Sequence, residues 1–137
     1  MPDVILNTHT FDVLFDQKTL NKLDQNGCHV YVAKCAWEKE LRGVRSLAVN
    51  LLSEAAGKLR KKFHVKTVNE EYLPDQLKNE LTKNGASSCD IEIATLAFER
   101  VSKSGQEVIL ITNDPHFQLS KLALERCRIF ATNKEDF

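Results

Sequence analysis

The stretch "VILITND", residues 108–114, joins a continuous run of branched apolar residues to a polar end. Because apolar and polar residues do not alternate along this run, it is typical of a strand in a parallel sheet that is covered on both faces. A second stretch of this kind, "VILNTHTF" at residues 4–11, stands near the start of the chain. Each stretch predicts a buried strand with polar residues at its carboxyl end, where ligands bind in such sheets.

Three further short runs rich in Val and Ile extend this pattern, and segments of helical period separate the runs. These helical segments include a basic one at 44–63, one that ends at Gly105 and a last one from Phe117 to Arg126. The five predicted strands are Val4–Leu6, His29–Ala33, Val65–Val68, Glu107–Thr112 and Arg128–Thr132. This alternation predicts an α/β fold with a mainly parallel, roughly five-stranded sheet and helices on both faces. The length of the chain and the lack of linkers or repeats predict a single domain over residues 1–137.

Composition narrows the class of protein. The apolar runs are far shorter than the ~20 residues that span a bilayer, and the first residues lack the pattern of a signal peptide, so we expect a cytoplasmic protein with no membrane partner. The four cysteines and four histidines show no metal-finger spacing. We therefore expect the cysteines to be small buried residues and the histidines to be ordinary ones, with only His116 standing close to a candidate site.

Charge is unevenly distributed along the chain. The net charge of zero argues at first against a nucleic-acid binder, but residues 39–66 hold eight Lys and Arg against two Glu, a local charge of +6. A neutral total can therefore hide a basic face. The candidates for contacts with nucleic-acid phosphates are Lys58, Arg60, Lys61 and Lys62. The same cluster also fits the last turn of a solvated helix, where cations suit the helix dipole.

Residues that suit a metal site are predicted to gather at the carboxyl edge of the sheet. Asn7 and Asp114 each follow a strand, and Glu40 lies near the start of the helix after the second strand. Asp90 opens a helix that can start at this edge, because the preceding helix at 74–84 carries the chain back. Carboxylates that share a cleft need a counterion, and an oxygen-only ligand set suits Mg²⁺ or Mn²⁺. Such ions activate water for the cleavage of phosphodiester bonds.

Each of these residues also has a simpler interpretation. Asp114 can cap a helix that begins at Pro115. Asp90 stands three residues after Ser87, as in a capping box. Asn7 can bond the backbone of a neighbouring loop, and Glu40 can lie in solvent beside the apolar stripe of its helix. The order and spacing of the whole set, rather than any one residue, favour a site.

Four motifs in order resemble those of the PIN-domain family, the metal-dependent ribonuclease fold of VapC-type toxins and several RNA-processing nucleases. They are "VILNTHTF" with Thr8 in register, "VYVAKCAWEKEL" with Glu40, "SCDIEIATLA" with Asp90 and "VILITNDPHF" with Asp114. The resemblance implies a three-layer α/β/α sandwich, a site for Mg²⁺ or Mn²⁺, and cleavage of RNA by activated water with help from the Thr112 hydroxyl. It also implies a role in a toxin–antitoxin pair or in ribosomal-RNA processing, an antitoxin or other protein partner, and assembly as a homodimer.

Asn7 departs from this family pattern, which has an Asp there. Asn keeps one acceptor oxygen but loses the negative charge and gains an NH₂ group that a cation repels, so we expect weaker metal binding and slower cleavage. Two origins fit: a natural Asn in a degenerate domain, or an Asp→Asn substitution that silences a nuclease. The predicted function is a metal-dependent endoribonuclease that Asn7 impairs. The alternatives are a non-catalytic module that binds RNA or a protein, and a haloacid-dehalogenase-like phosphatase, which Asn7 and His9 disfavour.

Overall fold

Five parallel strands form one sheet in the computed structural model, which describes residues 2–8, 10, 13–14, 16–25, 28–43, 54, 57–68 and 72–137. The strands are β1 (Asp3–Leu6), β2 (Val30–Ala33), β3 (Phe63–Lys66), β4 (Val108–Ile111) and β5 (Ile129–Thr132). They are arranged in the order β3-β2-β1-β4-β5, and every neighbouring pair is parallel. The predicted parallel, five-stranded sheet is therefore confirmed.

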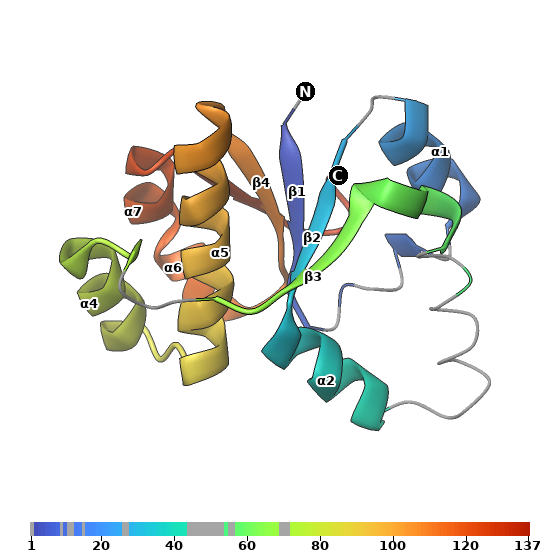
Figure 1. Ribbon diagram of the computed structural model, residues 1–137. Helices are drawn as coiled ribbons and strands as arrows, with labels where there is room; N and C mark the ends of the chain where they lie inside the picture. Colours follow the sequence, from blue (N-terminus) through green and yellow to red (C-terminus); the bar gives the residue numbers. More distant parts are fainter. Residues whose placement is uncertain are drawn as a thin grey trace.

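Helices lie on both sides of this sheet (Figure 1). They are α1 (Gln17–Gln25), α2 (Lys34–Gly43), α4 (Asp75–Lys83), α5 (Ser88–Ser104), α6 (Pro115–Leu119) and α7 (Lys121–Arg126), with a short 3-10 helix η2 (Arg60–Lys62) before β3. α5 packs on one face with α4 outside it, and α1 lies on the opposite side (Figure 1). This is the three-layer arrangement that the sequence predicts. None of the helices in the described ranges has the length and apolar character needed to cross a bilayer.

β1 is the central strand, and its burial explains why it is a continuous apolar run. Val4, Ile5 and Leu6 have no exposed surface, and all four residues of β2 are buried as well. Side chains on both faces of a parallel sheet must be apolar when helices cover both faces. The carboxyl ends of all five strands point to one edge of the sheet, which is the lower edge in Figure 1.

α5 begins and ends where the sequence predicts. Ser87 and Asp90 form a capping box at its first turn, which satisfies backbone N–H groups that have no partner inside the helix. Gly105 ends the helix with a φ of 69°, a left-handed conformation that costs glycine little. Between these ends, Ile93 and Leu96 are buried, and α5 packs against β1, β2 and β4.

Two predicted elements differ from the structure. The third strand spans Phe63–Lys66 rather than 65–68, and its Val65 is 41% exposed, because β3 is an edge strand with a single neighbour. The expectation of complete burial is therefore wrong for this strand. The predicted last helix is divided at Ser120, whose hydroxyl accepts a hydrogen bond from the side chain of Asn84 at 2.8 Å. Most of the basic helical region predicted at 44–63 lies outside the described residues.

Candidate metal centre

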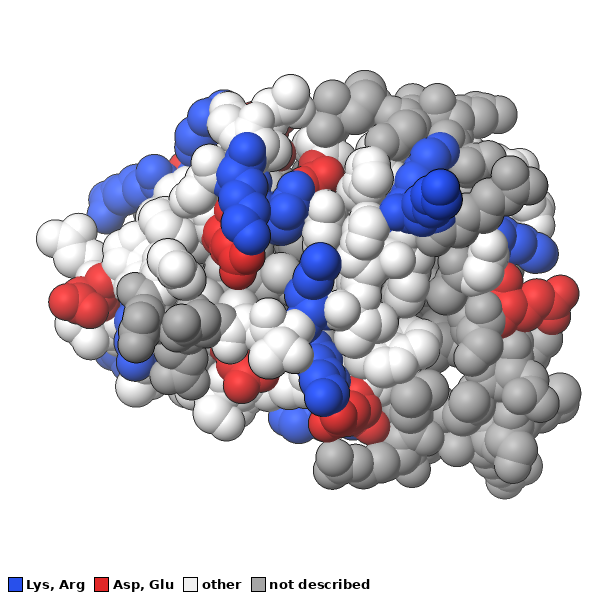
Figure 2. Space-filling view, in the orientation of Figure 1, with Lys and Arg blue, Asp and Glu red and all other residues white. Residues whose placement is uncertain are grey.

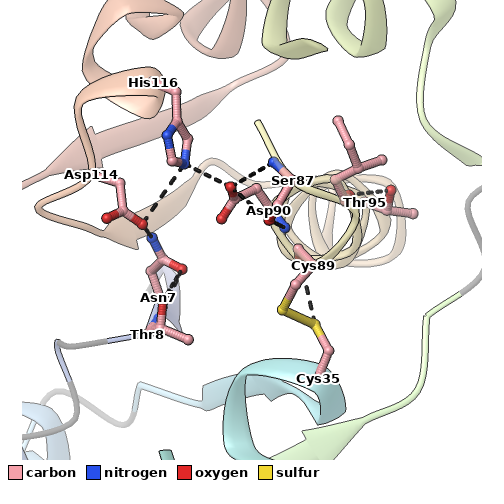
Figure 3. Close-up of a disulfide and its surroundings, with 10 residues drawn as sticks. Asn7, Thr8, Cys35, Ser87, Cys89, Asp90, Thr95, Asp114 and His116 are labelled. Atoms are coloured by element: carbon pink, nitrogen blue, oxygen red, sulfur yellow. Dashed lines mark hydrogen bonds and ion pairs between the residues drawn. A yellow bond between two sulfur atoms is a disulfide. The ribbon is translucent and has the colours of Figure 1, made fainter. Parts of the chain in front are cut away.

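The ends of β1 and β4 bring Asn7, Thr112 and Asp114 together, because these strands are neighbours in the sheet. Asn7 is fully buried, and its Nδ2 donates to Oγ1 of Thr112 at 2.8 Å and to Oδ2 of Asp114 at 2.6 Å. The backbone N–H of Asp114 donates to the same Thr112 oxygen at 3.1 Å. The predicted approach of Asn7 to Asp114 is therefore present (Figure 3), and Thr112 lies beside them.

The amide of Asn7 is held in one orientation from both ends. Its Oδ1 accepts a hydrogen bond from the backbone N–H of Thr8 at 2.8 Å, while its NH₂ group faces Asp114. A flipped amide would place an oxygen against the carboxylate and an NH₂ group against the N–H, so that both bonds would be lost. Asn7 thus serves as a hydrogen-bond donor to Asp114 in this structure.

Asp90 reaches the same edge from the first turn of α5. As predicted, α4 precedes α5 and returns the chain to the carboxyl edge (Figure 1). Asp90 is 7% exposed, and its Oδ2 accepts hydrogen bonds from the N–H and the hydroxyl of Ser87 at 2.8 and 2.9 Å. The capping-box interpretation of Asp90 is therefore confirmed, and the same carboxylate also faces His116 (Figure 3).

His116 completes the cluster, although sequence reasoning treated it as an ordinary residue. Its Nε2 lies 2.8 Å from Oδ2 of Asp90 and 3.8 Å from Oδ2 of Asp114. Pro115 starts α6 directly after Asp114, but the Asp114 side chain does not cap this helix and instead faces the cluster. The sequence offered one signal, the position of His116 two residues after Asp114.

Glu40 is only partly placed by the structure. It belongs to α2, the helix that follows β2, as predicted, but its side chain lies outside the part of the chain that the structure describes. α2 itself packs against α5, the helix that carries Asp90. The helix that contains Glu40 thus packs on the helix that contains Asp90, and the contact of the Glu40 carboxylate stays a prediction.

A disulfide between Cys35 and Cys89 joins α2 to α5 beside Asp90 (Figure 3). This bond corrects the expectation that the cysteines are small buried residues without a partner, which holds for Cys28 but not for Cys127, a free cysteine that is only partly buried. The two cysteines can pair because tertiary packing of α2 on α5 brings their Cα atoms to 5.8 Å, which is within the range of a disulfide. No local spacing predicts a pair that is 54 residues apart.

The basic residues predicted to contact RNA are not brought to the acidic cluster. They precede β3 in the chain and so lie at the amino-end edge of the sheet, opposite the carboxyl ends (Figure 1). Lys58 and Lys61 are exposed there, and Lys62 is half-buried. The side chain of Arg60 lies outside the described part of the chain. Figure 2 shows Lys and Arg interspersed with Asp and Glu on this view of the molecule rather than one continuous basic surface.

Two other lysines stand at the carboxyl edge and were missed. Lys34 is the first residue of α2, directly after β2, and Lys66 is the last residue of β3. Both side chains are exposed. The signal that would have found them is topological, since a residue that follows a parallel strand lies at the edge where the acids gather.

The ligand atoms of Asp90, Asp114 and His116 lie within 4.8 Å of one another. Nε2 of His116 is buried and has no hydrogen-bond partner, so its bonding capacity is unused despite the short distance to Asp90. Two ionised carboxylates in close range repel each other, and a nearby cation relieves this repulsion. Two oxygen ligands and one nitrogen ligand in this space fit a single divalent cation. No model of a known protein family matches the chain, and no curated protein matches its sequence, so these contacts carry the functional argument.

Proposed function

We propose that this chain carries a divalent-metal site for cleaving RNA phosphodiester bonds, of the type found in PIN-domain ribonucleases, and that Asn7 weakens this site. The observation that supports the proposal is the meeting of Asp90 and Asp114 at the carboxyl edge of the sheet, with Thr112 and residue 7 beside them. These residues come from three motifs far apart in the sequence. The capping role of Asp90 does not by itself explain why Asp114 lies close to it.

The described residues have separate roles in this proposal. Asp90 and Asp114 would hold the cation through their carboxylate oxygens, and α2, the helix that contains Glu40, packs against α5, which carries Asp90. A bound divalent cation supplies an activated water molecule and stabilises the charge that develops on the phosphate. Thr112 fixes the turn that presents Asp114, because its Oγ1 accepts hydrogen bonds from the Asp114 N–H and from Asn7.

Asn7 weakens the site in two ways. Its NH₂ group occupies Oδ2 of Asp114, an oxygen that would otherwise be free to bind a cation. It also brings no negative charge to a position that is completely buried, where charge acts through a low dielectric. An Asp at this position would remove the donor and add a carboxylate facing Asp114.

Lys34 and Lys66 are the proposed contacts for the RNA backbone. Both are exposed lysines at the carboxyl edge, so they can bind phosphates on a strand that passes the acidic cluster. Loss of both should reduce RNA affinity and flatten its dependence on salt. The matched control is Lys58 with Lys61, two lysines at the opposite edge, whose replacement should leave the salt dependence at the acidic site unchanged.

The direct test is cleavage by the Asn7→Asp variant with Mn²⁺ across several single-stranded and hairpin RNAs. We expect faster cleavage than by the parent chain, and none in EDTA. The matched control combines Asn7→Asp with Asp114→Asn, which keeps the restored acid but removes the opposing carboxylate, and should be inactive. If Asn7→Asp neither binds Mn²⁺ nor cuts any of the RNAs, the proposed nuclease function is wrong.

A second candidate function is a non-catalytic module that binds RNA or a protein. It is favoured by the hydrogen bond from Asn7 to Asp114 and by the 2.8 Å contact of His116 with Asp90, which engage both acids without a metal. Fluorescence anisotropy of the parent chain with labelled RNA distinguishes the two candidates. RNA binding that persists in EDTA, together with an inactive Asn7→Asp variant, would support the module.

A further inference from the structure

We propose that His116 is a direct ligand of the cation at Asp90 and Asp114, and that its imidazole makes this site select a borderline transition ion such as Fe²⁺, Co²⁺ or Zn²⁺ over Mg²⁺. This inference rests on the metal site of the proposed function and goes beyond it. Carboxylates alone suit Mg²⁺ and Mn²⁺, whereas an imidazole nitrogen suits the later transition ions. His116 therefore changes the class of cation that the residues prefer.

Nε2 of His116 lies between the carboxylates of Asp90 and Asp114. It lies 2.8 Å from Oδ2 of Asp90 and 3.8 Å from Oδ2 of Asp114, and all three residues offer ligand atoms within 4.8 Å of one another. Ligands bound to one ion at about 2.1 Å lie roughly 3–4 Å apart. The three side chains thus need only small adjustments to share an ion.

Nε2 of His116 is also free of hydrogen bonds to the described residues, although it is buried. Among the residues that the structure describes, it is the one buried side-chain nitrogen or oxygen atom with no hydrogen bond. Buried polar atoms that make no hydrogen bond are rare in folded proteins. Coordination of a cation would satisfy this nitrogen, and the close carboxylates would supply the charge that a divalent ion requires.

Neighbouring residues hold each of the three ligand residues in place. Ser87 holds Asp90 by two hydrogen bonds, and the hydroxyl oxygen of Thr112 fixes the turn at Asp114 by accepting a hydrogen bond from its backbone N–H. His116 lies in the first turn of α6, next to Phe117, whose side chain is completely buried and anchors the helix. Ligands fixed by such neighbours form a site in advance of binding, which favours coordination over rearrangement.

The test measures metal affinity rather than RNA cleavage. Tag-free Asn7→Asp protein is titrated with Co²⁺ and with Mg²⁺ by calorimetry, and Co²⁺ binding is also followed by its visible absorption. His116→Ala and His116→Gln are compared in this background, and both are checked for native near-ultraviolet circular dichroism. The matched control is His29→Ala, which removes an exposed histidine at the amino end of β2.

We expect His116→Ala to weaken Co²⁺ binding by about 10–100-fold and Mg²⁺ binding by less than about 3-fold, and to change the Co²⁺ absorption bands. His29→Ala should change neither. Equal losses for both ions, or no loss for either, would overturn the role of His116 even if Asn7→Asp cleaves RNA. If neither ion binds at any concentration tested, the metal site of the proposed function fails as well, and the contact of His116 with Asp90 is a metal-free ion pair.

Discussion

Replacing Asn7 by Asp should destabilise the metal-free protein strongly. The substitution removes the 2.6 Å hydrogen bond to Asp114, whereas Thr112 can keep its contact by donating its own hydroxyl. A hydrogen bond to a charged group contributes about 2 kcal/mol. Two unit charges about 4 Å apart repel by about 4 kcal/mol at an effective dielectric constant of about 20. Because Asp114 is 28% exposed, water reduces this repulsion, and we expect a net loss of about 4 kcal/mol.

Urea unfolding followed by circular dichroism measures this loss directly. In EDTA at pH 7, Asn7→Asp should unfold at lower urea with an unchanged slope. For a chain of this length the loss corresponds to a fall in Tm of roughly 15 °C. Addition of Mn²⁺ should restore stability above that of the parent, because a bound cation replaces the repulsion by attraction and stabilises the folded state by mass action.

Asn7→Ala is the matched control, because it removes the same donor without adding a charge. It should lose about 2–3 kcal/mol in EDTA and recover none of it with Mn²⁺. The reasoning is refuted if Asn7→Asp stays within about 1 kcal/mol of the parent in EDTA, or if Mn²⁺ stabilises Asn7→Asp and Asn7→Ala equally.

Two further predictions concern other parts of the molecule. Reduction of the Cys35–Cys89 disulfide should lower the free energy of unfolding by about 4 kcal/mol on the loop-entropy estimate for residues 54 apart, measured by urea unfolding with and without a reductant; a Cys35→Ser variant should show no response to reductant. Burial, and then the nearby His29, lower the pKa of His64, so the folded state favours the neutral ring. The contribution of His64 to the free energy of unfolding is therefore present above pH 6.5 and is lost as the pH falls below it. We expect His64→Gln to flatten the dependence of the free energy of unfolding on pH between pH 7 and pH 5. An unchanged pH dependence would contradict this assignment.

The central part of the fold could be predicted because strands buried on both faces are recognisable in the sequence as unbroken apolar runs. β1 and β4 are unbroken apolar runs for the same reason that they pair side by side under helices on both faces. α5 was predictable from a capping residue at Ser87 and a glycine at 105. β3 was misplaced because an edge strand is half exposed, so its apolar residues do not mark its limits.

Only those residues of the candidate site that directly follow a strand could be predicted from the sequence. Asn7 and Asp114 follow neighbouring strands, so the topology brings them together. The approach of His116 to Asp90 depends on how a helix of five residues turns after Pro115, and no periodic pattern encodes that turn. The predicted basic cluster was assigned by charge density alone, which does not distinguish residues before a strand from residues after it.

The Cys35–Cys89 bond also changes the shape of the chain once it is unfolded. The bond closes a ring whose two ends are 54 residues apart, and at about 3.5 Å per residue roughly 190 Å of extended chain is withheld from the two termini. A processive unfoldase that pulls on either terminus would therefore have to translocate two polypeptide segments side by side instead of one extended chain. In an oxidised protein, turnover by such a machine would depend on a pore wide enough for both segments or on prior cleavage of the sulfur–sulfur bond.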